Sequence, residues 1–224
     1  MSSVLKYKKR FERNSHDSAI TSVALNPRGS ILAAGSLDGN ISVWAVDTGS
    51  SLHRVNARSP ILSLVWSTCS EGFVFGCENG LLVSILLEEV RPPLNRFRGI
   101  VHSWPQVCVK TVYFEAHSGP ICCISPNSND NLLISGAVNE VTVWKRSRHY
   151  TTREGRQPLL SSLEKLTPVS TEKWEFLKTI PQPPEQYSRT GQAVKVTSVN
   201  WLQSRTSSGG QKFMVTSYLW HGVM

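Results

Sequence analysis

Residues 20–44 read ITSVALNPRGSILAAGSLDGNISVW, and the same pattern returns 41 residues later. Residues 61–85 read ILSLVWSTCSEGFVFGCENGLLVSI and align with the first copy without a gap, so that Gly35 falls on Gly76. Self-similarity at a period of about 40 residues indicates a repeat architecture. The repeat unit is therefore the feature from which the fold can be predicted.

Two further copies follow along the chain. The third copy, one residue shorter, reads ICCISPNSNDNLLISGAVNEVTVW over residues 121–144. A fourth begins as VTSVNW at Val196 and resumes as FMVTSYLWHGVM over residues 213–224. His16 and His117 each stand four residues before a copy. The repeat therefore covers most of the chain.

Each copy contains three short β-strand patterns separated by turn residues. In the first copy the predicted strands are residues 20–25, 31–36 and 41–44. The segment Asn26–Gly29 has the composition of a turn. The segment Asp38–Asn40 contains an Asp-Gly pair typical of a hairpin turn with positive φ. One copy is therefore a small antiparallel meander.

A fourth strand is predicted ahead of each histidine, over residues 5–13 and 108–115. Four antiparallel strands in a unit of about 40 residues are typical of a β-propeller blade. No stretch combines a helical hydrophobic period with capping residues. We therefore expect an all-β fold: a propeller of four-stranded antiparallel blades whose ring is incomplete, at about three and a half blades.

At this point the sequence resembles a known family, the WD repeat. The first copy carries a histidine, the motif GSLDG and a tryptophan in the family's order, and the third copy is a weaker example. The resemblance implies that a His, a Ser or Thr, an Asp and a Trp form a hydrogen-bonded set that braces the blade. Carried over by position, this structural set is His16, Asp38 and Trp44 in the first copy and His117, Ser135, Asn139 and Trp144 in the third.

The copies depart from the family pattern in places. Ala34 stands where the first copy should have its serine. In the second copy all four bracing positions are replaced, by Ala57, Phe75, Asn79 and Ile85. We therefore expect the second blade to be held together by hydrophobic packing.

The domain organisation follows from the copies. A single partial propeller spans residues 1–224, with blades at about 17–56, 59–115, 118–180 and, in part, 194–224. Loop insertions are expected at residues 86–107 and 145–173, the second followed by an outer strand at residues 174–180. Trp104, in the first insertion, is either an exposed contact for a partner or a residue that packs the loop onto its own blade.

The incomplete ring has three readings: a truncated product, an incomplete gene model, or an arc that another chain completes. Closed propellers have four to eight blades, and this sequence accounts for fewer than four. An open arc exposes strand edges and apolar blade faces, which favours self-association.

Charge and composition limit the compartment and the class of partner. The net charge is +8, but the basic excess lies at the N-terminus, in residues 145–193 and at the C-terminus, while residues 15–80 and residues 121–144 each carry a net charge of −2. A nucleic-acid ligand is therefore not favoured, although basic tails attract polyanions. No apolar run is long enough for a membrane helix, and no signal peptide is visible. We expect an intracellular protein of the cytoplasm or nucleus that does not insert into a membrane.

The five cysteines, an odd number without a CxxC pair, are expected to be unpaired in a reducing compartment and buried as small hydrophobic residues. Their spacing to histidines is not that of a zinc site, so no metal ligand is assigned.

Catalytic motifs are not found in the sequence. HExxH, GxSxG, Walker A and GxGxxG patterns are missing, and no cofactor is expected. His16 and His117 can be interpreted as general bases, but both stand at the family's structural position. The resemblance therefore implies a non-catalytic scaffold for protein–protein interaction, whose partner the sequence does not identify. Two alternatives stay open: an RNA- or DNA-associated propeller that uses its basic tails, and a subunit of a propeller enzyme.

Overall fold

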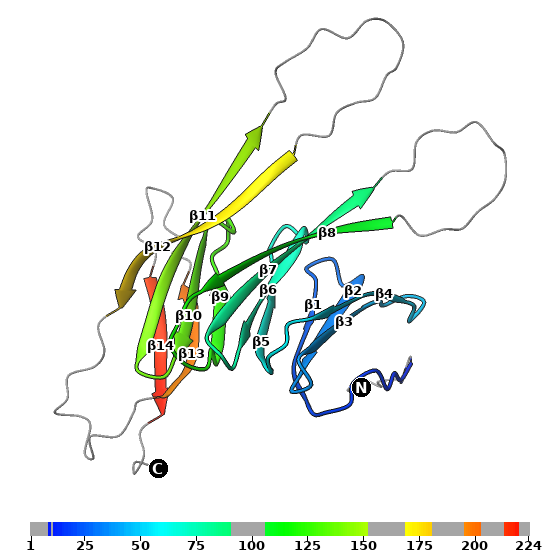
Figure 1. Ribbon diagram of the computed structural model, residues 1–224, viewed down its shortest axis with the longest axis horizontal. Helices are drawn as coiled ribbons and strands as arrows, with labels where there is room; N and C mark the ends of the chain where they lie inside the picture. Colours follow the sequence, from blue (N-terminus) through cyan, green and yellow to red (C-terminus); the bar gives the residue numbers. More distant parts are fainter. Residues whose placement is uncertain are drawn as a thin grey trace, which may run out of the picture.

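The computed structural model describes residues 9, 11–90, 106–151, 169–180, 195–202 and 213–219. Every regular element in these residues is a β-strand. Three four-stranded antiparallel sheets and one two-stranded sheet follow one another as an arc that does not close within the described residues (Figure 1). The predicted all-β, open propeller arc is therefore confirmed, and the sheets are called blades one to four.

Each blade is a meander in which strands adjacent in sequence are adjacent in the sheet. Blade one comprises β1 Ile20–Leu25, β2 Ile31–Ser36, β3 Asn40–Ala45 and β4 Ser51–Asn56. Blade two comprises β5 Ile61–Trp66, β6 Gly72–Cys77, β7 Leu81–Val90 and β8 Gln106–Glu115. Blade three comprises β9 Cys123–Pro126, β10 Leu132–Ala137, β11 Glu140–Thr151 and β12 Val169–Ile180. Blade four comprises β13 Lys195–Leu202 and β14 Phe213–Leu219.

The predicted turns of the first copy are present. The Gly29 N–H donates to the Asn26 carbonyl at 2.8 Å, and Gly29 has a φ of 66°. Gly39 has a φ of 77°, in the left-handed region that a residue without Cβ reaches at little cost. These turns set the strand register that places the residues discussed below.

The outer hairpins of blades two and three are longer than predicted. The β7–β8 ladder continues to the pair Val90↔Gln106, and the β11–β12 ladder continues to Thr151↔Val169. The expected loops 86–107 and 145–173 therefore begin and end inside strands, because unbroken backbone pairing extends each hairpin. Both ribbons project beyond the arc in the same direction (Figure 1). Trp104 lies outside the described residues.

The N-terminal segment does not form the predicted strand where the structure describes it. Residues 11–16 have no strand geometry, while residues 1–8 and 10 lie outside the described residues. Arg13 Nε donates to the Gly49 carbonyl at 3.0 Å, so this segment contacts the β3–β4 turn of blade one.

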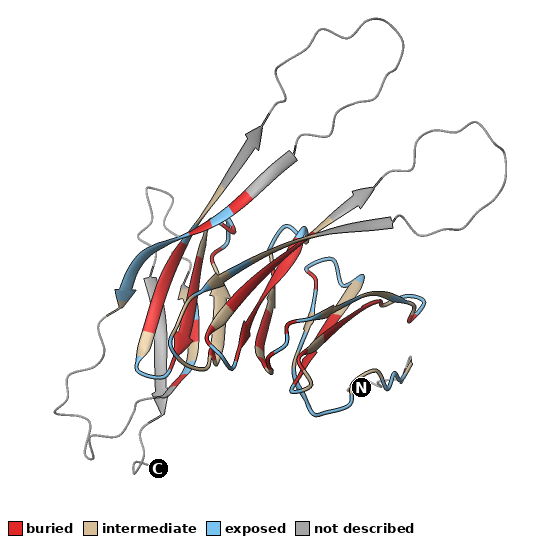
Figure 2. Cartoon of the chain, viewed as in Figure 1, coloured by how far each residue is buried: buried red, intermediate tan, exposed pale blue. Residues whose placement is uncertain are grey.

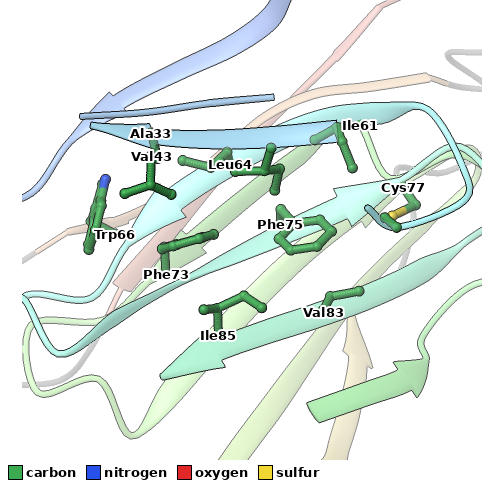
Figure 3. Packing of buried hydrophobic residues seen from close by; sticks show 12 residues of the cluster. Ala33, Val43, Ile61, Leu64, Trp66, Phe73, Phe75, Cys77, Val83 and Ile85 are labelled. Atoms are coloured by element: carbon green, nitrogen blue, oxygen red, sulfur yellow. The ribbon is translucent and has the colours of Figure 1, made fainter. Parts of the chain in front are cut away.

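The hydrophobic core lies within and between the blades (Figure 2). Its largest buried side chains include Phe73 and Phe75 of β6, which pack with Ile85 of β7 and with Ile61 of β5 (Figure 3). Phe75 and Ile85 occupy two of the positions that the bracing residues hold in the other copies. Blade two is therefore packed by apolar side chains at these positions, as its sequence predicts.

Successive blades meet where a glycine of one faces a branched side chain of the next. At three such glycines, an added methyl group would lie only 2.5 or 2.6 Å from the branched side chain of the next blade. The facing pairs are Gly35 with Ile61, Gly76 with Ile121, and Gly136 with Val196. Each blade therefore places the first strand of the next one through a contact that needs glycine.

Among the described residues, no helix has the length and apolar character needed to cross a lipid bilayer.

Candidate functional site

Blade three contains a chain of hydrogen bonds centred on His117. His117 Nδ1 lies 2.8 Å from Glu140 Oε2, and its Nε2 lies 2.6 Å from Ser135 Oγ. The Trp144 indole Nε1–H donates to the same hydroxyl oxygen at 2.8 Å. The His117 and Trp144 rings meet edge to face, with centroids 6.4 Å apart. A hydroxyl both donates and accepts, so Ser135 can satisfy both rings.

The carboxylate that faces His117 belongs to Glu140, one residue after the position that the alignment assigns to Asn139. Ala137 pairs with Glu140, which leaves a two-residue turn at the end of the hairpin. Asn139 adopts a φ of 60° there, the conformation that Gly39 has in blade one. The third copy is one residue shorter than the first, and this difference in length is visible in the sequence. The shorter turn moves the acidic side chain that faces the histidine by one position.

A carboxylate, an imidazole and a hydroxyl hydrogen-bonded in this order also form the catalytic triad of hydrolases. A nucleophilic serine must reach a substrate, whereas Ser135 is fully buried. The His117 side chain is also 0% exposed, and the Trp144 indole already donates to the hydroxyl. This burial supports a bracing role over a general-base role for His117.

Blade one contains an incomplete version of the same chain. His16 Nδ1 lies 3.3 Å from Asp38 Oδ2, and the His16 and Trp44 rings have centroids 6.2 Å apart. Ala34 occupies the position of Ser135, since each precedes the glycine that packs on the next blade. His16 Nε2 is buried and has no hydrogen-bond partner among the described residues. Because Ala34 lacks the hydroxyl that Ser135 provides in blade three, His16 Nε2 receives no hydrogen bond from this position.

Asp38 is held in its ionised form. Burial raises the pKa of this carboxyl, but hydrogen bonds outweigh burial and lower the pKa to about 2. The Asn40 N–H donates to Oδ1 at 2.8 Å, and the Asp17 N–H donates to Oδ2 at 3.0 Å. The nearby His16 lowers the pKa further. Asp38 therefore closes the β2–β3 turn as well as orienting His16.

Polar contacts that the sequence reasoning did not identify connect blades two and three. Asp130, buried in the β9–β10 turn at a φ of 53°, accepts from the Thr68 N–H at 2.9 Å and the Cys69 N–H at 3.1 Å. The Thr68 hydroxyl also donates to Asp130 Oδ2 at 2.7 Å. An aspartate in a polar turn carries no sequence signal for a contact with the neighbouring blade. Asp130 nevertheless holds the β5–β6 turn at a set distance from the β9–β10 turn.

A buried ion pair lies close to this junction. Arg146 of β11 pairs with Glu172 of β12, and their side chains are 7% and 1% exposed. Glu172 Oε1 also accepts from Ser84 Oγ of blade two at 2.7 Å and from Trp174 Nε1 at 2.6 Å. The Arg146 guanidinium carbon lies 5.6 Å from the Trp174 ring centroid. The Arg146 Nε is buried and has no hydrogen-bond partner among the described residues.

A groove of about 480 Å³ opens between the two turns. Its lining consists of Thr68, Cys69 and Glu71 from blade two, and residues 128–131 and Arg146 from blade three. Ligand sites in proteins have volumes of about 300–1,000 Å³, so the groove is large enough for a side chain with its adjoining backbone. This groove is the candidate binding site.

The cysteines differ in exposure. Burial raises the pKa of the Cys77 thiol to about 11, and burial together with Cys122 raises that of Cys123 to about 12. Cys69, in contrast, is exposed at the groove, so the prediction that every cysteine is buried was wrong. Polar residues surround Cys69 because it lies in a surface turn rather than on a strand. The described residues contain no cluster of three or more His, Cys, Asp or Glu side chains that could hold a metal ion.

A family model described as "WD domain, G-beta repeat" matches two segments of the chain, residues 7–45 and 106–144. The second match begins with β8 of blade two and ends with β11 of blade three. A sequence repeat therefore consists of the outer strand of one blade and three strands of the next. This offset explains why a fourth strand pattern precedes His117.

Solved propeller structures resemble this chain in fold. The structure of U3-55K matches with a TM-score of 0.51 and 14% identity, covering 84% of this chain and 44% of that one. The WD40 repeats of RRP9 match with a TM-score of 0.51 and 15% identity, covering 84% and 43%. The β-propeller domain of Myceliophteria thermophila Cps50 (Swd1) matches with a TM-score of 0.50 and 10% identity, covering 81% and 46%. The chain thus spans less than half the length of these structures.

Proposed function

We propose that this chain, a partial WD-repeat β-propeller, is a non-catalytic scaffold. It binds a partner protein through the turns of its blades. Propellers of the WD40 type serve in general as protein-interaction scaffolds. The identity of the contact surface is our proposal.

One observation supports the proposal most strongly: the turns at the groove are exposed but held in place. Thr68 and Cys69 are exposed, while Asp130, which accepts hydrogen bonds from both of their backbone N–H groups, is buried. A preorganised surface loses less conformational freedom on binding than a mobile one. These turns therefore suit recognition of another protein.

The two alternatives have weaker support. The hydroxyl and imidazole of the triad-like chain in blade three are buried, which does not suit hydrolysis. Residues 61–80 and 121–144, which contain both groove turns, include no lysine or arginine. A polyanion therefore finds no basic groups on these turns.

The test is capture of protein partners by the tagged chain, compared between two double variants. Arg28→Glu with Asn129→Lys changes exposed side chains in the β1–β2 and β9–β10 turns. Glu175→Lys with Lys178→Glu changes exposed side chains on the outer strand β12 and is the matched control. We expect a stoichiometric protein partner that the turn variant loses at least fivefold and the control retains.

Several outcomes would count against a turn-based scaffold. Equal capture by the two variants would place the interface elsewhere. Loss of the partner after nuclease treatment would favour the nucleic-acid alternative. Substrate turnover by the purified chain that Ser135→Ala abolishes would favour an enzyme.

We also propose that the protein acts inside the cell, in the cytoplasm or nucleus. Cys69, Cys77, Cys122 and Cys123 are free, which suits a reducing compartment. Fractionation of cells that express the tagged chain tests this, and recovery from the secreted fraction with oxidised cysteines would contradict it.

A further inference from the structure

The start of each later blade is covered by the blade before it. Ile61, Ile121 and Val196 hold equivalent positions at or just before the first strands of blades two to four, and each is 0% exposed. Each packs on a glycine in the second strand of the preceding blade. Ile20 holds the same position in blade one and is 53% exposed. Blade one therefore presents a junction face that no described residue covers.

The exposure of this face continues along β1. Val23 and Leu25 are 58% and 55% exposed, whereas their counterparts in β5, Leu64 and Trp66, are 9% and 5% exposed. Both strands have the same register shift after their first residue, so they present their apolar side chains in the same way. The face of β5 packs on residues of β2 and β3 in blade one. A propeller blade is therefore the surface that fits the face of β1.

The opposite end of the arc is blade four, and its second strand is β14 (Figure 1). In blades one to three, the residue of the second strand that contacts the next blade is a glycine. In blade one this glycine, Gly35, pairs with Ser22 of the first strand. The matching pair in blade four is Ser198 with Ser217. Ser217 therefore has the backbone position of a junction glycine, and the two ends of the arc carry the two halves of one junction.

We infer that two copies of this chain associate head to tail, with the β1 face of each copy on the β13–β14 sheet of the other. Ile20 of one copy then faces Ser217 of the second copy at both junctions. Head-to-tail contacts form a closed ring when the rotation closes. The chain covers 44% and 43% of two similar propeller structures, so two arcs together supply most of the length of one such propeller. This assembly is independent of the proposed scaffold function.

The junction between copies is weaker than the junctions within a chain. At the internal junctions, a Cβ in place of the glycine hydrogen would lie 2.5 or 2.6 Å from the facing side chain, and Ser217 has such a Cβ. Trp66 and Trp201 donate their indole N–H to carbonyls of the preceding blade at 2.9 and 3.0 Å. Leu25, at the matching position in β1, has no such donor. Looser packing and fewer hydrogen bonds make the association reversible.

The test uses two single substitutions in the full chain, Ile20→Cys and Ser217→Cys. Two cysteines form a disulfide when their Cβ atoms lie about 3.5–4.5 Å apart. The variants are mixed in equal amounts with glutathione and its disulfide, so that two protein thiols are oxidised while one glutathione disulfide is reduced to two thiols. Non-reducing gels measure the covalent dimer. Mass spectrometry of the linked peptides identifies the joined residues and separates them from links through native cysteines.

We expect the mixture to form a dimer linked between residues 20 and 217, at least fivefold more than either variant alone. Head-to-tail packing brings residue 20 of one copy to residue 217 of the other and keeps like positions apart. Leu25→Cys is the matched control, since it is exposed on the same strand but about 17 Å from residue 20 along an extended chain. Mixed with Ser217→Cys, it should give no more dimer than Ile20→Cys alone.

Ser217→Gly provides a second readout that needs no cross-link. It restores the glycine of the internal junctions and should lower the dissociation constant of the dimer at least threefold, measured by sedimentation equilibrium. Ser51→Gly makes the same change at an exposed position in the outer strand β4 and should leave the constant unchanged. An unchanged or weaker dimer in Ser217→Gly would contradict the contact at residue 217.

Three other results would overturn the inference. A dimer of Ile20→Cys linked through residue 20 of both copies would mean that two β1 faces pack on each other. Equal linking by Ile20→Cys and Leu25→Cys would show an unspecific contact. A chain that stays monomeric in light scattering and forms no 20–217 link would exclude a second copy as the occupant. Capture of a protein partner through the blade turns in any of these cases would leave the scaffold proposal standing.

Discussion

At the scale of single residues, a buried hydroxyl makes the difference between a complete and an incomplete bracing network. Ser135 bonds to both rings in blade three, whereas Ala34 leaves His16 Nε2 without a partner in blade one. The histidine and tryptophan rings have nearly the same relative placement in both blades. The backbone of blade one is therefore already arranged to accept the missing group.

We predict that Ala34→Ser stabilises the protein. The new hydroxyl would bond to His16 Nε2 and add about 0.5–1.5 kcal/mol to the free energy of unfolding, measured by urea denaturation. Ala33→Ser is the control, because it places the same hydroxyl at a fully buried neighbouring position in the apolar core. Equal destabilisation by both variants would show that residue 34 does not reach the histidine.

We predict that Asp38 makes stability depend on acidity in a defined range. Its pKa is about 2 in the folded state and about 3.9 in an unfolded chain, so the stabilisation is present above pH 4 and is lost as the pH falls toward 2. Asp38→Asn should lower the free energy of unfolding at neutral pH by on the order of 2 kcal/mol, and the difference should shrink through that range. A deficit for Asp38→Asn that stays constant as the pH falls through this range would refute the assignment.

At the scale of elements, the blades are joined by glycine contacts. Ile61, Ile121 and Val196 begin the first strands of their blades or precede them closely, and all three are fully buried. Each lies against a glycine in the second strand of the preceding blade. Backbone carbonyls add polar links, since Trp66 Nε1 donates to the Ala24 carbonyl at 2.9 Å. The junctions therefore depend on the absence of a Cβ at one position per blade.

We predict that Gly76→Ala destabilises the junction between blades two and three. The added methyl group would lie 2.5 Å from Ile121 Cγ2 and 2.9 Å from Ser63 Oγ, and such overpacking costs about 1–3 kcal/mol. Gly119→Ala is the control, because a methyl group there meets no atom within 4 Å. Thermal unfolding of the two variants provides the measurement, and equal melting temperatures would contradict the contact.

At the scale of the whole molecule, the described arc has one apolar face that no other blade covers. Ile20, the counterpart of the buried Ile61, is 53% exposed, and Val23 and Leu25 of the same strand are 58% and 55% exposed. Contiguous apolar surface of this kind promotes association. The shape of the arc, rather than any single residue, creates this face.

We predict that Val23→Thr with Leu25→Thr reduces concentration-dependent self-association of the chain, measured by light scattering, while the far-ultraviolet circular dichroism stays unchanged. Leu177→Thr removes a similarly exposed apolar side chain from the outer strand β12 and should leave association unchanged. The same reduction in both variants would mean that association does not depend on the β1 face.

The sequence by itself determined the repeat, the strands and the turns. Alternation of apolar residues, the Asn-Pro-Arg-Gly and Asp-Gly turns, and the recurring Gly35 and Gly76 are local signals that depend on only a few neighbouring residues. These signals predicted β2, spanning Ile31–Ser36, at its observed bounds. The resemblance to the WD repeat, in turn, implied that His117, Ser135 and Trp144 belong to one network, and these three side chains are joined by hydrogen bonds. The local signals did not identify β4, whose segment SLHRVN has no clear alternation.

Only the tertiary structure decided the contacts between side chains from different elements. It selected Glu140 as the carboxylate on His117, because a turn shortened by one residue changes which side chain faces the ring. It also brought Asp130 to Thr68, 62 residues away, and Arg146 to the groove beside them. A sequence read locally carries no information on such distances. The packing of one blade against the next fixes them, and the candidate binding site exists only at that junction.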